Sequence, residues 1–368
     1  MGDVRENNTA SMQKKSLAMN GGNGTNSYSK NSTVQREACM HAKTLIEEVI
    51  SEKLEVQNLL STASDRFCIA DLGCSVGPNT IMAMENVIEA VEKKFQSEGL
   101  NNSDIPEFIV FLNDQATNDF NTLFACLPPE KNYFVAGIPG SFHGQLFPRS
   151  SIHIAHSSFA LHWLSEIPKE VLRRHSAAWN KGRIFYTSAP EEVGEAYAAQ
   201  FARDIETFLN ARAKEMVAGG LLLILISATP DNFHRSQTGS GFIYDALGAS
   251  LMDMASEGVI REDQVDSFNL PIYVTNRKEM KAVIENNGSF GIERMELTEF
   301  KLEISGPLDT EKHVSHIRAA MEGIIAAHFG EEIIDDLFCR FNKRAKVLKN
   351  LDEKYRKGTL LFLALKCK

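Results

Sequence analysis

The sequence lacks the cysteine spacing of a disulfide-stapled domain. Six cysteines occur among 368 residues, and no two of them form a Cys-x-x-Cys pair. This usage fits a reducing compartment. Residues 1–18 also lack an apolar run long enough for a signal peptide or a membrane-spanning helix. We therefore expect a cytoplasmic protein that does not bind membranes.

An excess of positive charge is absent as well. The formal net charge is −9 at pH 7, and a phosphate backbone repels a surface of this sign. We therefore expect no nucleic-acid partner, whereas a positively charged sulfonium cofactor would not be repelled. The sequence also offers no credible Ser-His-Asp or Cys-His set, which argues against a nucleophile activated by a neighbouring base.

What the sequence does contain is an alternation of apolar, strand-like runs with amphipathic helices. Strands are predicted at 67–72, 108–112, 152–155, 183–187 and 221–226. Helices are predicted at 34–54, 79–94 and 191–217. Strands that alternate with helices indicate a mostly parallel sheet covered by helices on both faces.

The pattern changes after Ser227. Helices are predicted at 241–257, 277–287, 311–328 and 331–346, and a closing strand at 359–365. Apolar residues make up 43% of the chain, which is enough for a sizeable core. We expect a disordered tail at 1–18, then one domain at 19–368 whose helical cap comes mainly from about 230–345.

The sharpest local signal is Asp-Leu-Gly-Cys-Ser-Val-Gly at 71–77, between an apolar strand and a helix start. Glycines let the backbone turn tightly against a ligand, and the helix offers free N–H groups at its first turn. The spacing differs from the G-x-G-x-x-G of dinucleotide sites and matches the first motif of class I methyltransferases. The alternative is an ordinary turn in which Asp71 is incidental.

A second acidic residue, Asp114, ends the next predicted strand one strand–helix–strand unit later. A carboxylate at this place can accept hydrogen bonds from both ribose hydroxyls of a nucleoside. As an isolated residue, Asp114 would more often cap a helix or form a turn. Its pairing with the glycine motif favours the ribose role.

Longer motifs resemble the plant SABATH carboxyl methyltransferases. This family includes salicylate, jasmonate, farnesoate and loganate methyltransferases and the alkaloid N-methyltransferases that make caffeine. The resemblance spans about 18–366 and is carried by the motifs at 19–22 and 26–28, 71–75, 111–114 and 118–120, 137–142, 161–165, and 268–271. It implies a class I methyltransferase fold, Rossmann-like α/β with a mostly parallel sheet, helices on both faces and a mainly helical cap over the active site.

The resemblance implies S-adenosylmethionine as the cofactor. The residues that match its contacts in the family are Tyr28, Ser32, Asp71, Gly73, Asn79, Asp114, Ser141 and Phe142. Phe142 would stack near the adenine, with Ser141 as a polar partner. Tyr28 would lie beside the reactive methyl group and the bound acid.

The resemblance also implies a small carboxylic acid as the substrate. The residues that match its pocket are Tyr28, Gln35, His162, Trp163, Ser227, Tyr244 and Ile317. Gln35 and Trp163 would donate hydrogen bonds to the carboxylate, which only accepts them, and would align it without acting as acid or base. Taken alone, Gln35 reads as a helix-surface residue, and Trp163 and His162 read as core residues.

Two pocket positions differ from the salicylate-type members. His162 and Tyr244 stand where those enzymes resemble one another in having Met and Trp. Ser227 and Ile317 match apolar pocket positions less securely. The resulting pocket is roomier and more polar, which favours a jasmonate-like, loganate-like or farnesoate-like acid.

Two further features follow from the resemblance alone. The first is an optional Mg²⁺ at Asn180, Asp266, Asn269 and the backbone of Phe268, where the alternative is a hydrogen-bonded loop. The second is a homodimer.

The predicted function is formation of a methyl ester, with the carboxylate ionised at neutral pH and no base required. An N-methyltransferase of a xanthine-like alkaloid and a non-catalytic acid-binding protein are the alternatives. Retention of both Gln35 and Trp163 favours the ester.

Overall fold

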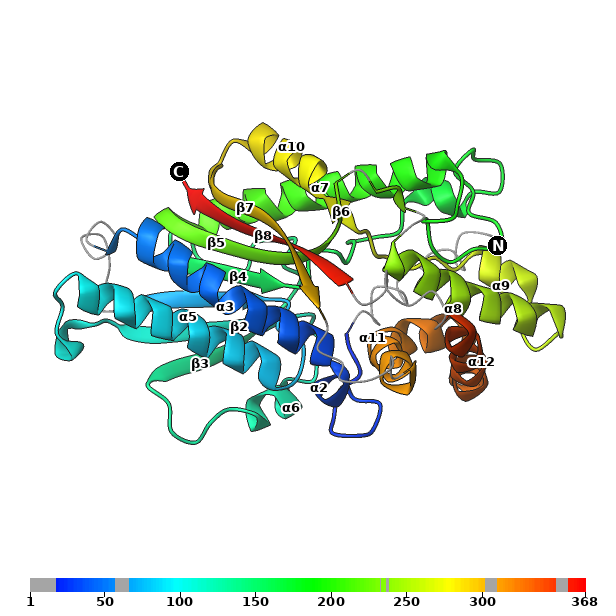
Figure 1. Cartoon of the computed structure of the whole chain (residues 1–368), viewed down its shortest axis with the longest axis horizontal. Helices are drawn as coiled ribbons and strands as arrows, with labels where there is room; N and C mark the ends of the chain where they lie inside the picture. Colours follow the sequence, from blue (N-terminus) through cyan, green and yellow to red (C-terminus); the bar gives the residue numbers. More distant parts are fainter. Residues whose placement is uncertain (1–17, 57–65, 232, 236–237, 302–309, 349–356) are drawn as a thin grey trace.

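An eight-stranded sheet forms the centre of the part of the chain that the computed structural model describes, residues 18–56, 66–231, 233–235, 238–301, 310–348 and 357–368 (Figure 1). The strands lie in the order β3 (Tyr133–Pro139), β2 (Glu107–Asp114), β1 (Arg66–Leu72), β4 (Ile152–Ser158), β5 (Met216–Thr229), β8 (Lys357–Cys367) and β7 (Phe290–Lys301). The short strand β6 (Thr275–Asn276) pairs with β5. The first five strands in this order are parallel, and β8 runs antiparallel to both of its neighbours. The predicted mostly parallel sheet is confirmed.

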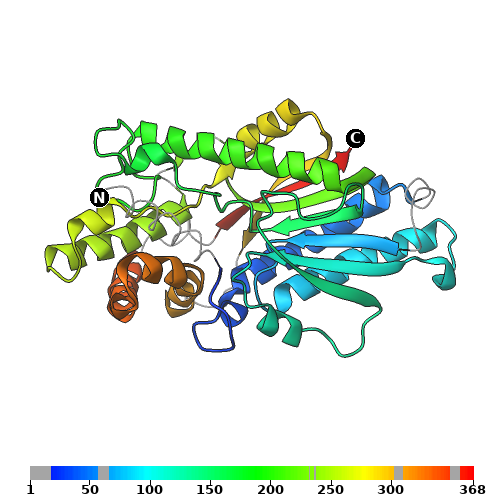
Figure 2. The same cartoon turned by 180° about the vertical axis from the view of Figure 1, so that it is seen from behind.

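Helices cover both faces of this sheet (Figures 1 and 2). On one face lie α3 (Thr33–Lys53) and α5 (Pro78–Ser97). On the other lie α7 (Glu191–Glu215) and α10 (Arg277–Asn287). Strand β5 has apolar side chains on both faces of the sheet, so both faces must be shielded from water by helices. Its side chains alternate between the two cores, with Leu221 and Leu223 on the α3 side and Leu222 and Ile224 on the α7 side.

The cap gathers beyond the carboxyl ends of the parallel strands (Figure 1). It consists of α8 (Gly239–Ser256), α9 (Glu262–Asp266), α11 (Thr310–Phe329) and α12 (Ile334–Leu348). These helices share a continuous apolar core with the α7 face of the sheet, so the cap is a packed extension of that face. Of the expected tail, residues 1–17 lie outside the described residues.

Local signals in the sequence explain several helix ends. Asn276 caps α10, because its side chain accepts a hydrogen bond from the backbone N–H of Glu279 at 3.0 Å. Gly288 ends the same helix with φ of 72°, a left-handed conformation that glycine adopts without a steric penalty. The predicted bounds of this helix, 277–287, match those observed.

The strand predicted at 183–187 is wrong. These residues form turns, and their apolar side chains fill the space beneath the cap. The Phe185 ring lies 4.6 Å from the ring of Tyr244, and Tyr186 stacks on Tyr197 at 5.0 Å. Burial in an aromatic cluster produces the same apolar run as burial in a sheet, and the two cannot be separated by periodicity. The alternation predicted no strand at the positions of β3 and β7.

No helix among the described residues combines the length and apolar character required to cross a membrane.

Candidate active site

The segment before α3 lies between the sheet and the cap. It contains the short helix α2 (Tyr28–Asn31), and the backbone N–H of Tyr28 donates to the carbonyl of Asn20 at 2.8 Å. Asn20 in turn donates to the carbonyl of Ala319 on α11 at 3.0 Å. Gly22 donates its N–H to the Asp119 carboxylate at 2.8 Å, which anchors this segment to the loop before α6 (Phe120–Ala125). Two contacts with distant parts of the chain, at Ala319 and Asp119, therefore position the segment that carries Tyr28.

The glycine motif forms a tight turn at the end of β1. Gly73 has φ of 83°, and a Cβ there would lie 2.2 Å from the Cβ of Ala160, so a larger side chain cannot be accommodated. The N–H groups of Gly73 and Cys74 both donate to the carbonyl of Asn113, each at 2.9 Å. The motif predicts this tight turn, and the two hydrogen bonds fix it against the end of β2.

Asp71 is buried, and its carboxylate contacts groups of the protein itself. One oxygen lies 2.7 Å from Nδ1 of His156, and the other accepts a hydrogen bond from the Thr80 hydroxyl. Both partners come from elements that flank the turn, β4 and α5. Asp71 thus joins β1 to its neighbours, and any contact with a cofactor would be additional to this role.

Asp114 lies beside the turn, as the second motif predicts. Its two carboxylate oxygens accept hydrogen bonds from the backbone N–H groups of Ser75 and Gln115, each at 2.7 Å. Burial raises the pKa of Asp114 to about 6, although both hydrogen bonds act to lower it. A carboxylate offers about four lone-pair positions, so this side chain has acceptor capacity left for a ligand.

Polar atoms without partners surround Asp114. Ser75 Oγ, Asn113 Oδ1 and Asn118 Oδ1 are buried and have no hydrogen-bond partner among the described residues. Ser75 also has φ of 54°, a strained conformation for a residue other than glycine. Buried polar groups are nearly always hydrogen-bonded in native proteins, so this cluster indicates the site of a polar ligand.

Asn79 and Ser32 contact each other directly. The side-chain amide of Asn79 donates to the carbonyl of Ser32 at 3.0 Å and to its hydroxyl at 2.9 Å. Asn79 belongs to the first turn of α5, and Ser32 is the residue between α2 and α3. This pair brings the N-terminal segment to the glycine motif, so all of these predicted cofactor residues lie in one neighbourhood.

Phe142 lies against the same turn. A Cβ on Gly73 would be 3.5 Å from its ring, and the ring contacts Phe208 of α7 edge-on at 6.2 Å between ring centroids. Ser141 is exposed, and its hydroxyl accepts from the N–H of His143 at 3.4 Å. The loop after β3 therefore presents one apolar ring and one hydroxyl at the edge of the polar cluster.

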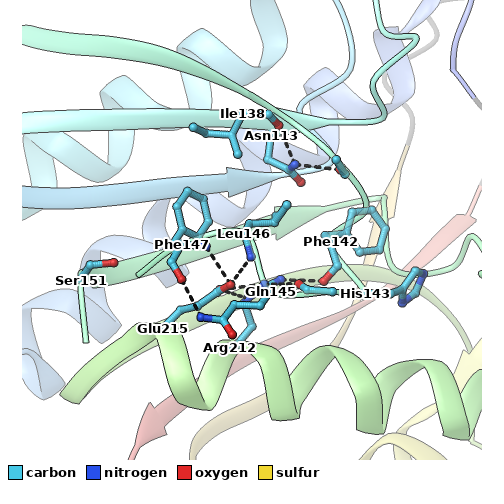
Figure 3. A network of polar contacts seen from close by, with 12 residues as sticks. Asn113, Ile138, Phe142, His143, Gln145, Leu146, Phe147, Ser151, Arg212 and Glu215 are labelled. Atoms are coloured by element: carbon cyan, nitrogen blue, oxygen red, sulfur yellow. Dashed lines mark hydrogen bonds and ion pairs between the residues drawn. The ribbon is translucent and has the colours of Figure 1, made fainter. Parts of the chain in front are cut away.

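A buried ion pair at the end of α7 holds this loop (Figure 3). Arg212 and Glu215 are 1% and 0% exposed, and Arg212 Nε donates to Glu215 at 2.7 Å. The guanidinium also donates to the carbonyls of Phe142 at 2.7 Å and Gly144 at 2.9 Å. The sequence contains no signal for this pair, because its partners in the loop lie about seventy residues earlier.

Glu215 completes the network from the other side. Its Oε1 accepts from the backbone N–H groups of Leu146 and Phe147, the latter at 3.0 Å. Both charges are thus satisfied by each other and by backbone groups, the arrangement that buried ions require. Arg212 and Glu215 together therefore hold the loop that carries Phe142 against the end of α7.

Gln35, one of the residues predicted to bind an acid, lies beside a histidine on α11. His316 Nδ1 lies 2.9 Å from the carbonyl of Asn31, and its Nε2 lies 3.5 Å from the amide nitrogen of Gln35. His162 precedes Trp163, and its ring centroid lies 6.0 Å from that of Trp163. Burial, with a smaller effect of His316, lowers the pKa of His162 to about 4.

Residues 162–164 are held by backbone contacts with the segment at 271–273. Tyr273 donates its N–H to the carbonyl of His162 at 2.9 Å, and Leu164 donates to the carbonyl of Pro271 at 2.8 Å. Trp163 forms an isolated antiparallel bridge with Ile272 and is half-buried. Its backbone position is thus set by the segment that follows the motif at 268–271.

The remaining predicted pocket residues are spread more widely. Tyr244 and Ile317 are buried in the core shared by the cap and the sheet, and Ser227 is half-buried near the end of β5. Burial raises the pKa of the Tyr244 hydroxyl, which keeps it protonated at neutral pH. The sequence prediction did not include His313 and His316, although their spacing of three residues places both on one side of α11.

The predicted metal residues form a buried hydrogen-bonded cluster. Asn180 Nδ2 donates to Asn269 Oδ1 at 2.7 Å, and Gly182 donates its N–H to Asp266 at 2.8 Å. Asn180 Oδ1 is buried and has no partner among the described residues. Phe268 is fully buried, with its ring against His328 and Phe329. No group of three or more His, Cys, Asp or Glu side chains suited to a metal occurs in the described ranges.

The strand order, the glycine turn after β1 and the acidic residue at the end of β2 together define a class I methyltransferase. The sequence profile of the SAM-dependent carboxyl methyltransferases matches residues 14–368, and the chain belongs to this family. The enzyme is therefore an S-adenosylmethionine-dependent carboxyl methyltransferase. The resemblance stated from the motifs is confirmed.

Individual relatives agree with this assignment. A loganic acid O-methyltransferase from Catharanthus roseus is 45% identical over 353 residues, which cover 95% of this chain and 94% of that protein. A farnesoic acid carboxyl-O-methyltransferase from Arabidopsis thaliana is 42% identical over 86% of this chain and 89% of its own length. The solved structure of a loganic acid methyltransferase with SAH superposes with a TM-score of 0.90 at 45% identity, covering 95% of this chain and 98% of that one.

Proposed function

We propose that this methyltransferase esterifies a carboxylic acid that is bulkier and more polar than a flat aromatic acid, with Gln35 and Trp163 as the donors to its carboxylate. The carrying observation is the contact of Gln35 with His316 on α11, where the pKa of the neighbouring His162 is lowered by burial and, to a smaller extent, by His316. The relatives that methylate loganic and farnesoic acids support an acid of this size. His162, Tyr244, Ser227, Ile317 and Tyr28 would line the rest of the pocket.

The cofactor residues support the same proposal. Asp114 would accept the ribose hydroxyls, Phe142 would contact the adenine with Ser141 beside it, and Gly73 would let the backbone approach the ligand. Asp71, Ser32 and Asn79 would hold the turn and the N-terminal segment in place. S-adenosylmethionine supplies the methyl group on a sulfonium when it is bound. The unpartnered polar atoms around Asp114 fit such a ligand.

The protein's contribution to the reaction is alignment. A carboxylate is ionised at neutral pH, so no residue has to remove a proton. Neutral donors at Gln35 and Trp163 fix the carboxylate without cancelling its charge, whereas an arginine would make it a weaker nucleophile. Placing two reactants in a reactive geometry can lower a barrier by about 7–11 kcal/mol. Burial around His162 and His316 also removes water that would compete for the carboxylate.

The product should be a methyl ester, formed at a rate that is nearly independent of pH between 6 and 9. Burial, with a smaller effect of His316, lowers the pKa of His162 to about 4, so this ring is neutral throughout the range. Single-turnover rates with saturating acid and cofactor, followed by mass spectrometry of the product, would test this. A steep rise in rate with pH that disappears in His162→Gln would contradict it, because a base would then be in use.

We further propose that Mg²⁺ is optional. The unpartnered Asn180 oxygen and the Asp266 carboxylate are hard ligands of the kind that Mg²⁺ prefers, with Asn269 and the Phe268 backbone beside them. The cation would fasten the 180–182 turn to the loop at 266–269. Two hydrogen bonds already join these segments, so the arrangement holds without it.

A homodimer and a cytoplasmic location are also proposed, on the family resemblance and on the sequence features given above. Light scattering at micromolar protein concentration should report twice the mass of one chain. A mass equal to that of one chain would contradict the dimer.

A further inference from the structure

Three histidines adjoin the proposed carboxylate donors or one another, because His162 precedes Trp163, His316 contacts Gln35, and His313 lies one turn before His316 on α11. They are His162, His313 and His316, called here the histidine wall. The ring centroids of His313 and His316 are 6.4 Å apart, and His316 contributes, after burial, to the lowered pKa of His162. His162 Nδ1 and His313 Nε2 are buried and unpartnered among the described residues.

The hydrogen bonds of His316 determine how Gln35 is oriented. The Asn31 carbonyl can only accept, so His316 Nδ1 must carry the hydrogen. In a neutral ring Nε2 is then the acceptor, and Gln35 has to present its amide N–H to it. Burial lowers the pKa of His316 and keeps the ring neutral. One amide hydrogen of Gln35 is left for the carboxylate, and Gln35 Oε1 is left buried without a partner.

Three buried atoms are left without partners among the described residues: Gln35 Oε1, His162 Nδ1 and His313 Nε2. Their chemistry restricts the ligand groups that can form hydrogen bonds with them. Gln35 Oε1 only accepts, so it requires a donor, which a ketone or an alkene does not provide. A neutral histidine nitrogen is a donor or an acceptor depending on its tautomer, and a hydroxyl can serve either. A hydrocarbon placed here would leave all three atoms unsatisfied, at a cost in affinity for each.

We propose that the histidine wall and Gln35 Oε1 bind hydroxyl groups on the body of the acid, which makes the enzyme selective for hydroxylated acids over hydrocarbon acids of the same skeleton. This inference rests on the proposed function, because it places the acid's carboxylate at Gln35 and Trp163. The inference adds a chemical requirement, hydroxyl groups on the acid, to the size given in the proposed function. When a site has buried polar groups, a substrate analogue without the matching hydroxyl leaves those groups unpaired and is strongly rejected. An apolar site discriminates less strongly against a substrate that carries an extra hydroxyl.

The test compares acids that differ only in their hydroxyl groups. Shikimic acid is paired with cyclohex-1-enecarboxylic acid, and 3-hydroxydodecanoic acid with dodecanoic acid, so that each hydroxyl is near the carboxylate, and kcat/KM is measured for each with labelled cofactor. The hydroxylated member should be favoured by about five- to 150-fold for each group that it satisfies. His313→Phe should reduce this ratio, since it removes an unpartnered nitrogen and leaves Gln35 and Trp163 in place.

His328→Phe is the matched control. His328 is on the same helix, but its Nε2 already contacts the carbonyl of Gln264 at 2.9 Å. Its substitution should leave the ratio unchanged even if it lowers stability. Preference for the hydrocarbon acids, or a ratio that is the same in folded His313→Phe, would overturn the inference alone. Cofactor binding without methylation of any of the four acids would overturn the proposed function, and the inference with it.

Discussion

Replacing Asp114 with asparagine should lower the affinity for S-adenosylmethionine at least a hundredfold. In the proposed site the carboxylate accepts both ribose hydroxyls, and each charge-assisted hydrogen bond contributes about 1.5–3 kcal/mol. The asparagine amide keeps the size of the side chain but loses its charge and one acceptor. Calorimetric titration with S-adenosylmethionine measures the change directly, and unchanged affinity would remove Asp114 from the site.

Two controls separate this effect from a distorted turn. Asp104→Asn alters an exposed acidic residue before the same strand and should leave binding unchanged. The wild-type affinity should also fall as the pH drops through about 6, because Asp114 then becomes protonated and its carboxylate is lost. The affinity of Asp114→Asn should lack this dependence. A pH profile shared by both proteins would assign the titration to another group.

Removing both carboxylate donors should lower kcat/KM for the acid by about 10²- to 10⁴-fold. Trp163→Phe and Gln35→Leu each delete one hydrogen bond to a charged group, about 1.5–3 kcal/mol, and the double variant deletes both. Cofactor affinity should be nearly unchanged, because neither residue is assigned to the cofactor. Steady-state kinetics of the single and double variants give the two contributions and their coupling.

The chain contains one other tryptophan, which serves as the matched control. Trp179 is half-buried, with the Lys181 ammonium 5.6 Å from its ring, and is not assigned to either ligand. Trp179→Phe should leave kcat/KM unchanged. A loss in Trp179→Phe equal to that in Trp163→Phe would show that the effect comes from general destabilisation.

The elements that sequence reasoning predicted well are those with one strong local pattern. The helix at 277–287 has its own cap and its own terminating glycine, so nothing distant is required to define it. Strand β3 contains a glycine and a proline and has an exposed Phe134, as an edge strand can, and it lacks a clear apolar pattern. Strand β7 mixes apolar and charged residues and is defined by its pairing with β8, which no local pattern reveals.

In the candidate site, too, residues in local motifs could be predicted from the sequence, whereas the contacts between distant residues could not. Asp71, Gly73 and Asp114 could be predicted because they lie in two compact motifs at the ends of strands. The contacts that position them come from distant residues, such as His156 for Asp71 and Asn113 for the glycine turn. His316 meets Gln35 across 281 residues of sequence, and only the packing of α11 on the N-terminal segment brings them together.

The buried pair of Arg212 and Glu215 limits how this enzyme can be altered. Removing one member of such a pair leaves an uncompensated charge and costs about 3–5 kcal/mol, a large part of the 5–15 kcal/mol that holds a typical domain folded. Mutant libraries aimed at new acids should therefore leave both positions fixed and vary the cap, where Tyr244 and Ile317 lie on separate helices. The proposed adenine side should then be less affected by a redesigned acid side, because Arg212 and Glu215 of α7 hold its loop directly.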